Sequence, residues 1–263
     1  MARAGNGRRG ASVQVAPVEE SPLQGIGSLC CTVIVALFVF TFIFENFVIP
    51  SASMASTLLV GDHVTADRAS LAPASPWAHV LPYRELRRGE PVVFLKPILE
   101  PDGTNITLVK RVVGLPGDRI HLRDGILYLN GVAQDEPQTA KPTALDQDAY
   151  RDNFPTVSPG RDPRVTATWA LDLPTHIQDG DLVVPANHYF MMGDNRTNSL
   201  DSRYWGFVDR KNLIGRPLFV YWSAEIPEEN GEPTTAESLA LTMHELTHFL
   251  TGTRWNRTLH SVR

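Results

Sequence analysis

Dense runs of basic residues are absent from this 263-residue sequence, whose formal net charge is -5. Because binding to phosphate groups needs a concentrated basic face, we expect no nucleic-acid partner. Cysteine is almost absent too: Cys30 and Cys31 are adjacent and lie in an apolar run, so they are poorly placed to join distant parts of the chain. Folding therefore needs no disulfide, which neither proves nor excludes an exported compartment.

Charge is missing altogether from Ile26 to Phe44, IGSLCCTVIVALFVFTFIF. This length is close to the ~20 residues with which a helix spans a bilayer. A buried core helix is the first alternative, but the run is apolar on every face. A removable signal peptide is the second, but its apolar region would be shorter, and the residues after Phe44 are not a small-residue cleavage site. The sequence therefore predicts a transmembrane helix, which we assign to residues 26–48.

The charges before this segment predict its orientation. Arg3, Arg8 and Arg9 precede it, whereas the acidic residues Glu19 and Glu20 count little in the positive-inside rule. We therefore expect residues 1–25 to form a cytoplasmic tail and the chain after Phe44 to lie outside. In a bacterium this describes a single-pass protein of the inner membrane with a periplasmic body.

A serine-rich turn follows the apolar run, in FENFVIPSASMASTLLVGDHV (44–64). Pro50, Ser51 and Ser53 suit a turn that exposes a hydroxyl group. Ser53 is nine positions after Phe44, and at ~3.3 Å per residue even a straight chain reaches about 30 Å, so Ser53 is expected near the membrane surface. A serine in such a turn is usually only a turn former, so the turn alone does not identify a nucleophile.

A lysine stands in the middle of an apolar, β-branched stretch, ITLVKRVVGLPGDRI (106–120), which predicts a buried strand. Lys110 is costly there unless it is neutral, paired or reaching solvent. Burial lowers the pKa of a lysine, and a change from ~10.4 to near 8 takes only about 3 kcal/mol. Lys110 is thus either an unprotonated amine near neutral pH or an edge-strand lysine that extends to water.

Four strings occur in the order known from the type I signal peptidases, and together the chain resembles that family. They are IPSASM with the following Thr57-Leu58 and Gly61-Asp62, RRGEPVVFLKP (87–97), KRVVGLPGD (110–118) and HYFMMGDNRTNSLDSRYWGFV (188–208). Ser56 stands where the family usually has proline, and Glu90 replaces its usual aspartate. Because proline only stiffens the turn, the first difference concerns rigidity rather than chemistry.

The resemblance implies a catalytic Ser/Lys dyad, with Ser53 as nucleophile and Lys110 as general base. It also implies that the Ser51 hydroxyl and the Ser53 backbone N–H stabilise the oxyanion. None of the eight histidines falls in a string that resembles a Ser-His-Asp protease.

Further positions of the fourth string have supporting roles in the family. The match implies that Ser199 orients the lysine amine, that Asp201 and Arg203 form an ion pair beside the site, and that Gly193 and Asp194 shape the loop. A neutral amine needs such neighbours to fix its direction.

The implied activity is that of a serine endopeptidase that removes signal peptides from exported preproteins through an acyl-enzyme. By the same resemblance its subsites are shallow and accept small residues. The expected partners are preprotein signal peptides and the lipid bilayer, and no cofactor or metal is expected.

Alternating apolar segments and turn signals predict the fold class: mainly β, an antiparallel β-sheet catalytic body with a small variable insertion, preceded by one N-terminal transmembrane helix. Asp124-Gly125 and Asn130-Gly131 are typical hairpin turns. We assign residues 49–134 and 181–225 to the catalytic core. The proline-rich and acidic residues 135–180 form the insertion or cap, and residues 226–263 a C-terminal linker and helix.

Two alternative functions stay open. His244-Glu-Leu-Thr-His248 matches the HExxH pattern of zinc proteases, but only 15 residues follow it, without an acid and with only His260 as a possible third ligand. The other alternative is a membrane-tethered β domain that is a catalytically silent scaffold. Separately, the uncharged loop Leu71 to Tyr83 is a candidate for contact with lipid through Trp77.

Overall fold

The computed structural model describes residues 22–71, 84–100, 102–143, 145–225 and 252–262. The HExxH string and the loop around Trp77 lie outside these residues. The chain divides into two compact units, residues 1–39 and 40–263.

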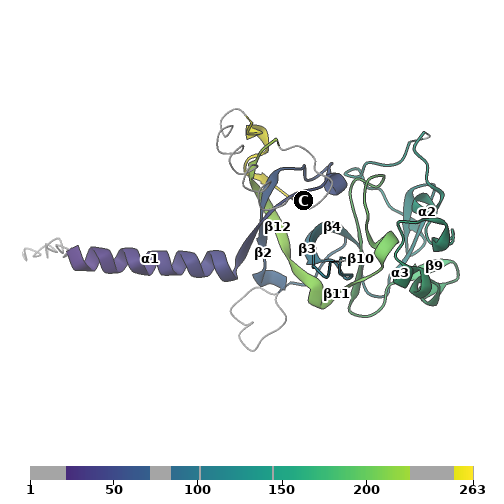
Figure 1. Ribbon diagram of the computed structural model, residues 1–263, viewed down its shortest axis with the longest axis horizontal. Helices are drawn as coiled ribbons and strands as arrows, with labels where there is room; N and C mark the ends of the chain where they lie inside the picture. Colours follow the sequence, from purple (N-terminus) through teal and green to yellow (C-terminus); the bar gives the residue numbers. More distant parts are fainter. Residues whose placement is uncertain (1–21, 72–83, 101, 144, 226–251, 263) are drawn as a thin grey trace, which may run out of the picture. The chain divides into compact units, whose positions relative to one another are not determined.

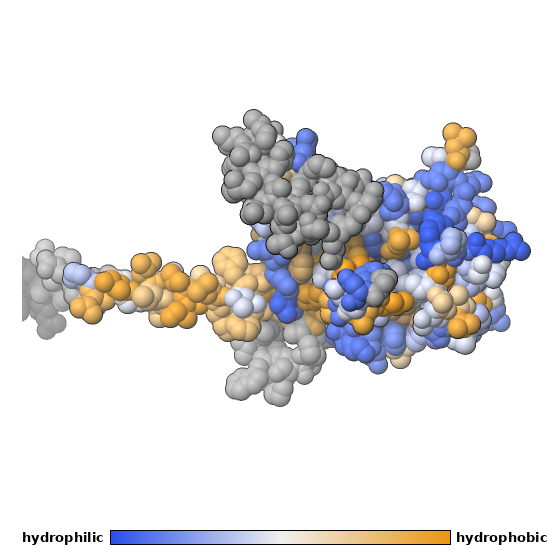
Figure 2. All heavy atoms as spheres, viewed as in Figure 1, coloured by the Kyte–Doolittle hydropathy of each residue, from blue (hydrophilic) through white to orange (hydrophobic). Residues whose placement is uncertain are grey.

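The N-terminal helix α1 spans Pro22–Phe42 and buries none of its residues. By length and composition it is apolar enough to cross a membrane. Figure 2 shows most of its residues in the colours of the hydrophobic end of the scale. The helix ends earlier than the sequence suggested, because Phe44–Val48 forms the strand β1. Polar residues return here, and β1 pairs antiparallel with β2, with Phe47 opposite Val64.

The larger sheet of the body is antiparallel, with the strand order β1-β2-β12-β3-β4-β10-β11 and with β13 paired to β12 (Figure 1). Its further strands are β2 (Asp62–Asp67), β3 (Pro91–Leu95), β4 (Thr107–Gly114), β10 (His188–Met192), β11 (Val208–Asp209), β12 (Leu213–Ser223) and β13 (His260–Ser261). Consequently β4, which carries Lys110, is an interior strand between β3 and β10.

A second antiparallel sheet has the order β7-β6-β5-β9-β8. Its strands are β5 (Arg119–Arg123), β6 (Ile126–Leu129), β7 (Val132–Ala133), β8 (Ile177–Gln178) and β9 (Asp181–Val183). Both predicted hairpin turns are present: Asp124-Gly125 joins β5 to β6 and Asn130-Gly131 joins β6 to β7, each with two positive φ angles.

Short helices fill the connections. They are η1 (Ala52–Met54), η2 (Ala69–Leu71), α2 (Ala149–Asp152), η3 (Pro159–Arg161), α3 (Ala167–Asp172), η4 (Leu173–His176), α4 (Ser202–Trp205), η5 (Arg210–Asn212) and η6 (Trp255–Arg257). In Figure 1, α2, α3 and β9 lie on the same side of the body. Tyr150, Phe154 and Trp169 of this region join the main hydrophobic core, so these side chains anchor the region to the body.

A smaller core cluster lies beneath the serine-rich turn. It consists of Ile49, Met54, Leu58, Val64 and Val220. These buried side chains come from the turn itself and from β2 and β12, so burial fixes the turn against the larger sheet. The predicted fold class, mainly antiparallel β with an N-terminal apolar helix, is confirmed.

Candidate active site

Ser53 lies in the one-turn helix η1 and is buried to 8% exposure. The next residue, Met54, inserts into the smaller core cluster and fixes the turn from below. The backbone of the segment closes on itself, because Ile49 N donates to Asp62 O and Gly61 N donates to Ile49 O, both at 2.9 Å. The hydroxyl is therefore presented from a well-packed loop.

Lys110 lies at the centre of β4, opposite Val92 of β3, and is 3% exposed. Its Nζ and Ser53 Oγ are hydrogen-bonded, although the two residues are 57 positions apart. Ser51 Oγ lies 3.4 Å from Ser53 Oγ. The structure thus brings together the three residues for which the resemblance implied the reaction chemistry.

Burial lowers the pKa of Lys110 from 10.5 to about 8. Asp201 and Asp194 favour the charged amine and oppose this change, whereas the guanidinium of Arg203 adds to it. With a pKa of about 8, an appreciable share of Lys110 is neutral near neutral pH and able to accept a proton. This is the environment that the sequence predicted for a lysine in a buried strand.

The Asp201–Arg203 ion pair implied by the resemblance is present and completely buried. Arg203 Nε donates to Asp201 Oδ1 at 2.8 Å and Nη2 donates to Oδ2 at 2.7 Å. Asp201 also accepts from Gly193 N at 3.1 Å, so the pair holds the backbone of the adjoining loop. Because the guanidinium and two carboxylate oxygens satisfy each other in a fork geometry, their burial is tolerated.

The loop after β10 contacts the serine turn directly. Asn195 N donates to Ser53 O at 3.0 Å, and Asn195 Nδ2 donates to Ala52 O at 3.2 Å. Gly193 is so close that an added Cβ would meet Ser53 O at 2.5 Å. This close approach explains why glycine occupies the position.

Asp194 connects the serine turn with β4. Its carboxylate accepts from Arg111 Nε at 2.7 Å and Nη2 at 2.6 Å, and from Thr57 Oγ1 at 2.5 Å. Sequence reasoning missed Arg111. The signal was available: two successive charged residues in a buried strand point to opposite faces, so Arg111 needed a partner on the face away from Lys110.

Ser199 is buried beside Gly193, whose added Cβ would lie 2.3 Å from its Oγ. Its hydroxyl makes no hydrogen bond among the described residues, and therefore none to Lys110. The role of Ser199 in orienting the amine stays a prediction.

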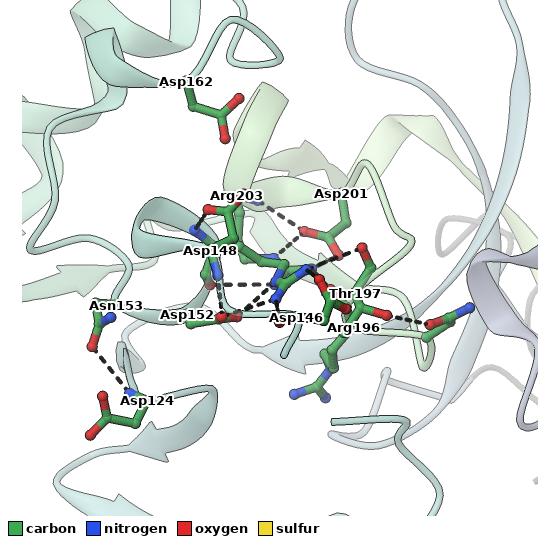
Figure 3. A network of polar contacts seen from close by, with 12 residues as sticks. Asp124, Asp146, Asp148, Asp152, Asn153, Asp162, Arg196, Thr197, Asp201 and Arg203 are labelled. Carbon is green, nitrogen blue, oxygen red and sulfur yellow. Dashed lines mark hydrogen bonds and ion pairs between the residues drawn. The ribbon is translucent and has the colours of Figure 1, made fainter. Parts of the chain in front are cut away.

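A network of buried polar contacts extends from Arg203 to the segment 135–180 (Figure 3). Arg196 forms a two-pronged ion pair with Glu136, with distances of 2.7 and 2.6 Å, and Arg151 donates to Asp152 at 2.7 Å. Tyr150 Oη donates to Arg203 O at 2.6 Å. Residues of the segment 135–180, to which the sequence assigned no catalytic role, thus support Asp201 and Arg203 at the start of α4.

A cleft leads to the serine and the lysine. It is lined by Phe47, Val48, Ile49, Pro50, Ser51, Ser53, Met54, Thr107, Leu108, Val109 and Lys110. Its walls are the end of β1 and the first half of β4, and most of the lining side chains are apolar. Among the described residues, no group of three or more His, Cys, Asp or Glu side chains could hold a metal ion.

Comparison with known proteins identifies a family. The family described as signal peptidase, peptidase S26, matches residues 23–222. A signal peptidase I of Pseudomonas aeruginosa is 34% identical, and the match covers 76% of this chain and 72% of that protein. A signal peptidase I of Buchnera aphidicola is 32% identical, and the match covers 77% of this chain and 76% of that protein.

A crystal structure of a signal peptidase I from Enterococcus faecalis V583 is 30% identical, covering 51% of this chain and 97% of its own with a TM-score of 0.32. The assignment depends on the family model and the two sequence relatives, which each extend over most of the chain. The chain therefore belongs to the signal peptidase family, peptidase S26, and is a serine peptidase of the type I signal peptidase kind.

Proposed function

We propose that this protein is a membrane-bound signal peptidase I that cleaves N-terminal signal peptides from exported preproteins through a Ser53/Lys110 dyad. The observation that carries the proposal is the buried hydrogen bond between Lys110 Nζ and Ser53 Oγ at the end of an apolar cleft. The names of the relatives support the substrate class.

The reaction follows from this geometry in two steps. Ser53 Oγ attacks the carbonyl carbon of the scissile peptide bond while Lys110 Nζ, in its neutral form, takes the hydroxyl proton. The C–N bond then breaks, Lys110 returns the proton to the leaving amine, and the signal peptide is held as an ester on Ser53. In the second step Lys110 takes a proton from a water molecule, which attacks the ester carbonyl. The bond to Ser53 Oγ then breaks, Lys110 returns the proton to Oγ, and the signal peptide leaves with a free carboxyl group.

The oxyanion that forms in each step needs hydrogen-bond donors. The Ser51 hydroxyl is close enough to Ser53 Oγ to serve as one, and the Ser53 backbone N–H is the other. Because Gly193, Asp194 and Asp201 keep the loop against the turn, these donors are fixed before substrate binds. The roles of Gly193, Asp194 and Asp201 are thus to support the geometry of the site rather than to react.

The cleft favours an extended substrate with small side chains. Residues of β1 and β4 line it together with the serine turn, and Ile49, Met54 and Val109 contribute apolar side chains to the same lining as Ser53. A peptide with small residues before the scissile bond fits such a site. Charged side chains would be desolvated there without partners.

Family membership and helix α1 together indicate a membrane-anchored protein. The arginines before α1 favour a cytoplasmic N-terminus and a periplasmic body in the inner membrane. The short chain between the helix and Ser53 keeps the dyad within reach of a signal peptide that is still in the bilayer.

A processing assay with purified protein and a preprotein tests the proposal. Ser53→Ala and Lys110→Met should each abolish cleavage, whereas the exposed control variants Ser158→Ala and Lys141→Met should cleave at the wild-type rate. A wild-type protein that cleaves no preprotein would support the scaffold alternative. Loss of wild-type cleavage in a chelator would support the zinc alternative at His244–His248 instead.

A further inference from the structure

The C-terminal segment, residues 252–262, lies beyond the part of the chain that matches the family. It packs along β12: Val220 is opposite His260 in β13, Leu259 N donates to Val220 O at 2.7 Å, and Val262 N donates to Leu218 O at 2.9 Å. Figure 1 shows the segment, in yellow, beside β12. Its position is therefore fixed by the same sheet that supports the serine turn.

Two arginines of this segment reach the residues that follow Ser53. Arg257 donates through Nη2 to Asp62 Oδ2 at 2.5 Å and to Thr57 O at 3.0 Å, and through Nε to Asp62 Oδ1 at 3.2 Å. Arg254 Nη2 donates to Val60 O. One guanidinium thus connects both ends of the loop 57–62, and a second binds its middle.

The Asp62 carboxylate depends on the hydrogen bonds from Arg257 because Asp62 is fully buried. It also accepts from Ser223 Oγ at 2.6 Å and Leu59 N at 2.9 Å. Burial alone raises the pKa of the Asp62 carboxyl, but the hydrogen bonds from Arg257 and Ser223 outweigh burial and hold the pKa below its ordinary value. Asp62 is therefore an anion whose main cationic partner comes from the far end of the chain.

Thr57 connects this loop to the dyad. Its backbone N donates to Met54 O at 2.8 Å, next to Ser53, and its side chain donates to Asp194. Arg257 therefore restrains a residue that contacts both the nucleophile turn and the loop beside Lys110. The adjacent Ser56 lacks the backbone restriction of the proline usual in the family, so an external restraint has more effect here.

We propose that Arg257 is a positioning residue: its hydrogen bonds to Thr57 and Asp62 hold the turn in which Ser53 Oγ faces Lys110 Nζ. This inference rests on the proposed peptidase reaction. The hydrogen bonds of Arg257 go to Thr57 and Asp62, and Arg257 is not among the residues that line the cleft. Its loss should therefore affect the rate of the chemical step rather than substrate binding, since small displacements of a nucleophile slow the reaction strongly.

Steady-state kinetics of the full-length protein on a preprotein test this inference. Arg257→Gln should lower kcat by about tenfold and change KM by less than about twofold, as expected for a misplaced nucleophile. Arg257→Lys, which keeps the positive charge beside Asp62, should restore part of kcat. The matched control Arg123→Gln, at an exposed position of β5 in the other sheet, should leave both constants unchanged.

Thermal unfolding of the same variants shows whether each variant is folded at the assay temperature. A kcat of Arg257→Gln equal to that of wild type, with or without a lower Tm, overturns the inference. If Arg257→Gln does not fold, Arg257→Lys decides: a reduced kcat at unchanged KM supports positioning, and a wild-type kcat overturns it. A wild-type protein without cleavage contradicts the proposed function instead, so the two failures are distinguishable.

Discussion

Gly193 and Ser53 are in direct backbone contact: a Cβ placed on Gly193 would lie 2.5 Å from the Ser53 carbonyl oxygen. The same Cβ would lie 2.3 Å from Ser199 Oγ. Because a backbone carbonyl in a packed turn cannot rotate away as a side chain can, the loop and the turn approach this closely only with glycine. The position of the nucleophile therefore depends on a residue without a side chain.

Gly193→Ala should push the loop away from the serine turn and reduce processing by about 100-fold or more, since a misplacement of about 1 Å has this effect. The measurement is kcat/KM on a preprotein. Gly160→Ala is the control, because its Cβ would find only Ser158 Oγ at 3.9 Å, an ordinary contact, and should be neutral. Wild-type activity of Gly193→Ala would show that the loop yields without moving Ser53.

Ser199→Ala should separate catalysis from stability. The buried Ser199 hydroxyl has no partner among the described residues, so its removal should not lower the free energy of unfolding. If it orients the Lys110 amine during the reaction, kcat should fall by about tenfold or more. Parallel urea unfolding and kinetics measure both; an unchanged kcat would remove Ser199 from the proposed site.

Arg203→Met should destabilise the protein by about 3–5 kcal/mol, because it leaves the fully buried Asp201 carboxylate without its ion-pair partner. Burial raises the pKa of Asp201, but Arg203, with the Gly193 N–H and the Lys110 amine, outweighs burial and holds the pKa below its ordinary value. This stabilisation is present above the unfolded-state pKa of the carboxyl and is lost as the pH falls. Denaturant unfolding at neutral pH measures the loss, and a loss below about 1 kcal/mol would contradict the expected energetic role.

Lys110→Met should abolish activity and yet stabilise the fold. Because burial lowers the pKa of Lys110 to about 8, the unfolded chain binds this proton more tightly than the folded protein does. The resulting penalty on the wild type is about 3 kcal/mol below pH 8 and disappears as the pH rises past about 10. Unfolding free energies of both proteins across this range should converge; a constant difference would contradict the lowered pKa.

The sequence predicted the site better than it predicted the elements that support it. Lys110 in an apolar strand pointed to a lowered pKa through burial alone, and the strings around Ser53 and Lys110 joined the two residues through the resemblance. The boundary of the apolar helix was less clear, because Phe44 and Phe47 fit both a helix and the strand β1. Pairing with β2 decides between them.

The supporting ion pairs could not be read from local patterns. Arg257 and Asp62 are 195 positions apart, and no periodicity connects a charged residue near one end of the chain with a carboxylate near the other. Residues 226–263 are expected to form a linker and a helix, and the stretch expected to be helical lies outside the described residues. The described residues 252–262 hold the short helix η6 and the strand β13. Only the three-dimensional fold shows that this segment reaches the serine turn.

The dependence of kcat/KM on pH tests most directly whether a neutral Lys110 activates Ser53. The substrate should be a preprotein without ionisable side chains near the scissile bond, so that the profile reports the free enzyme. Because only the uncharged amine accepts the proton, kcat/KM should rise about tenfold per pH unit and level off above a pKa of about 8. A profile that is flat from pH 6 to about 9, or that keeps rising to the ordinary lysine pKa of ~10.4, would contradict the proposed dyad.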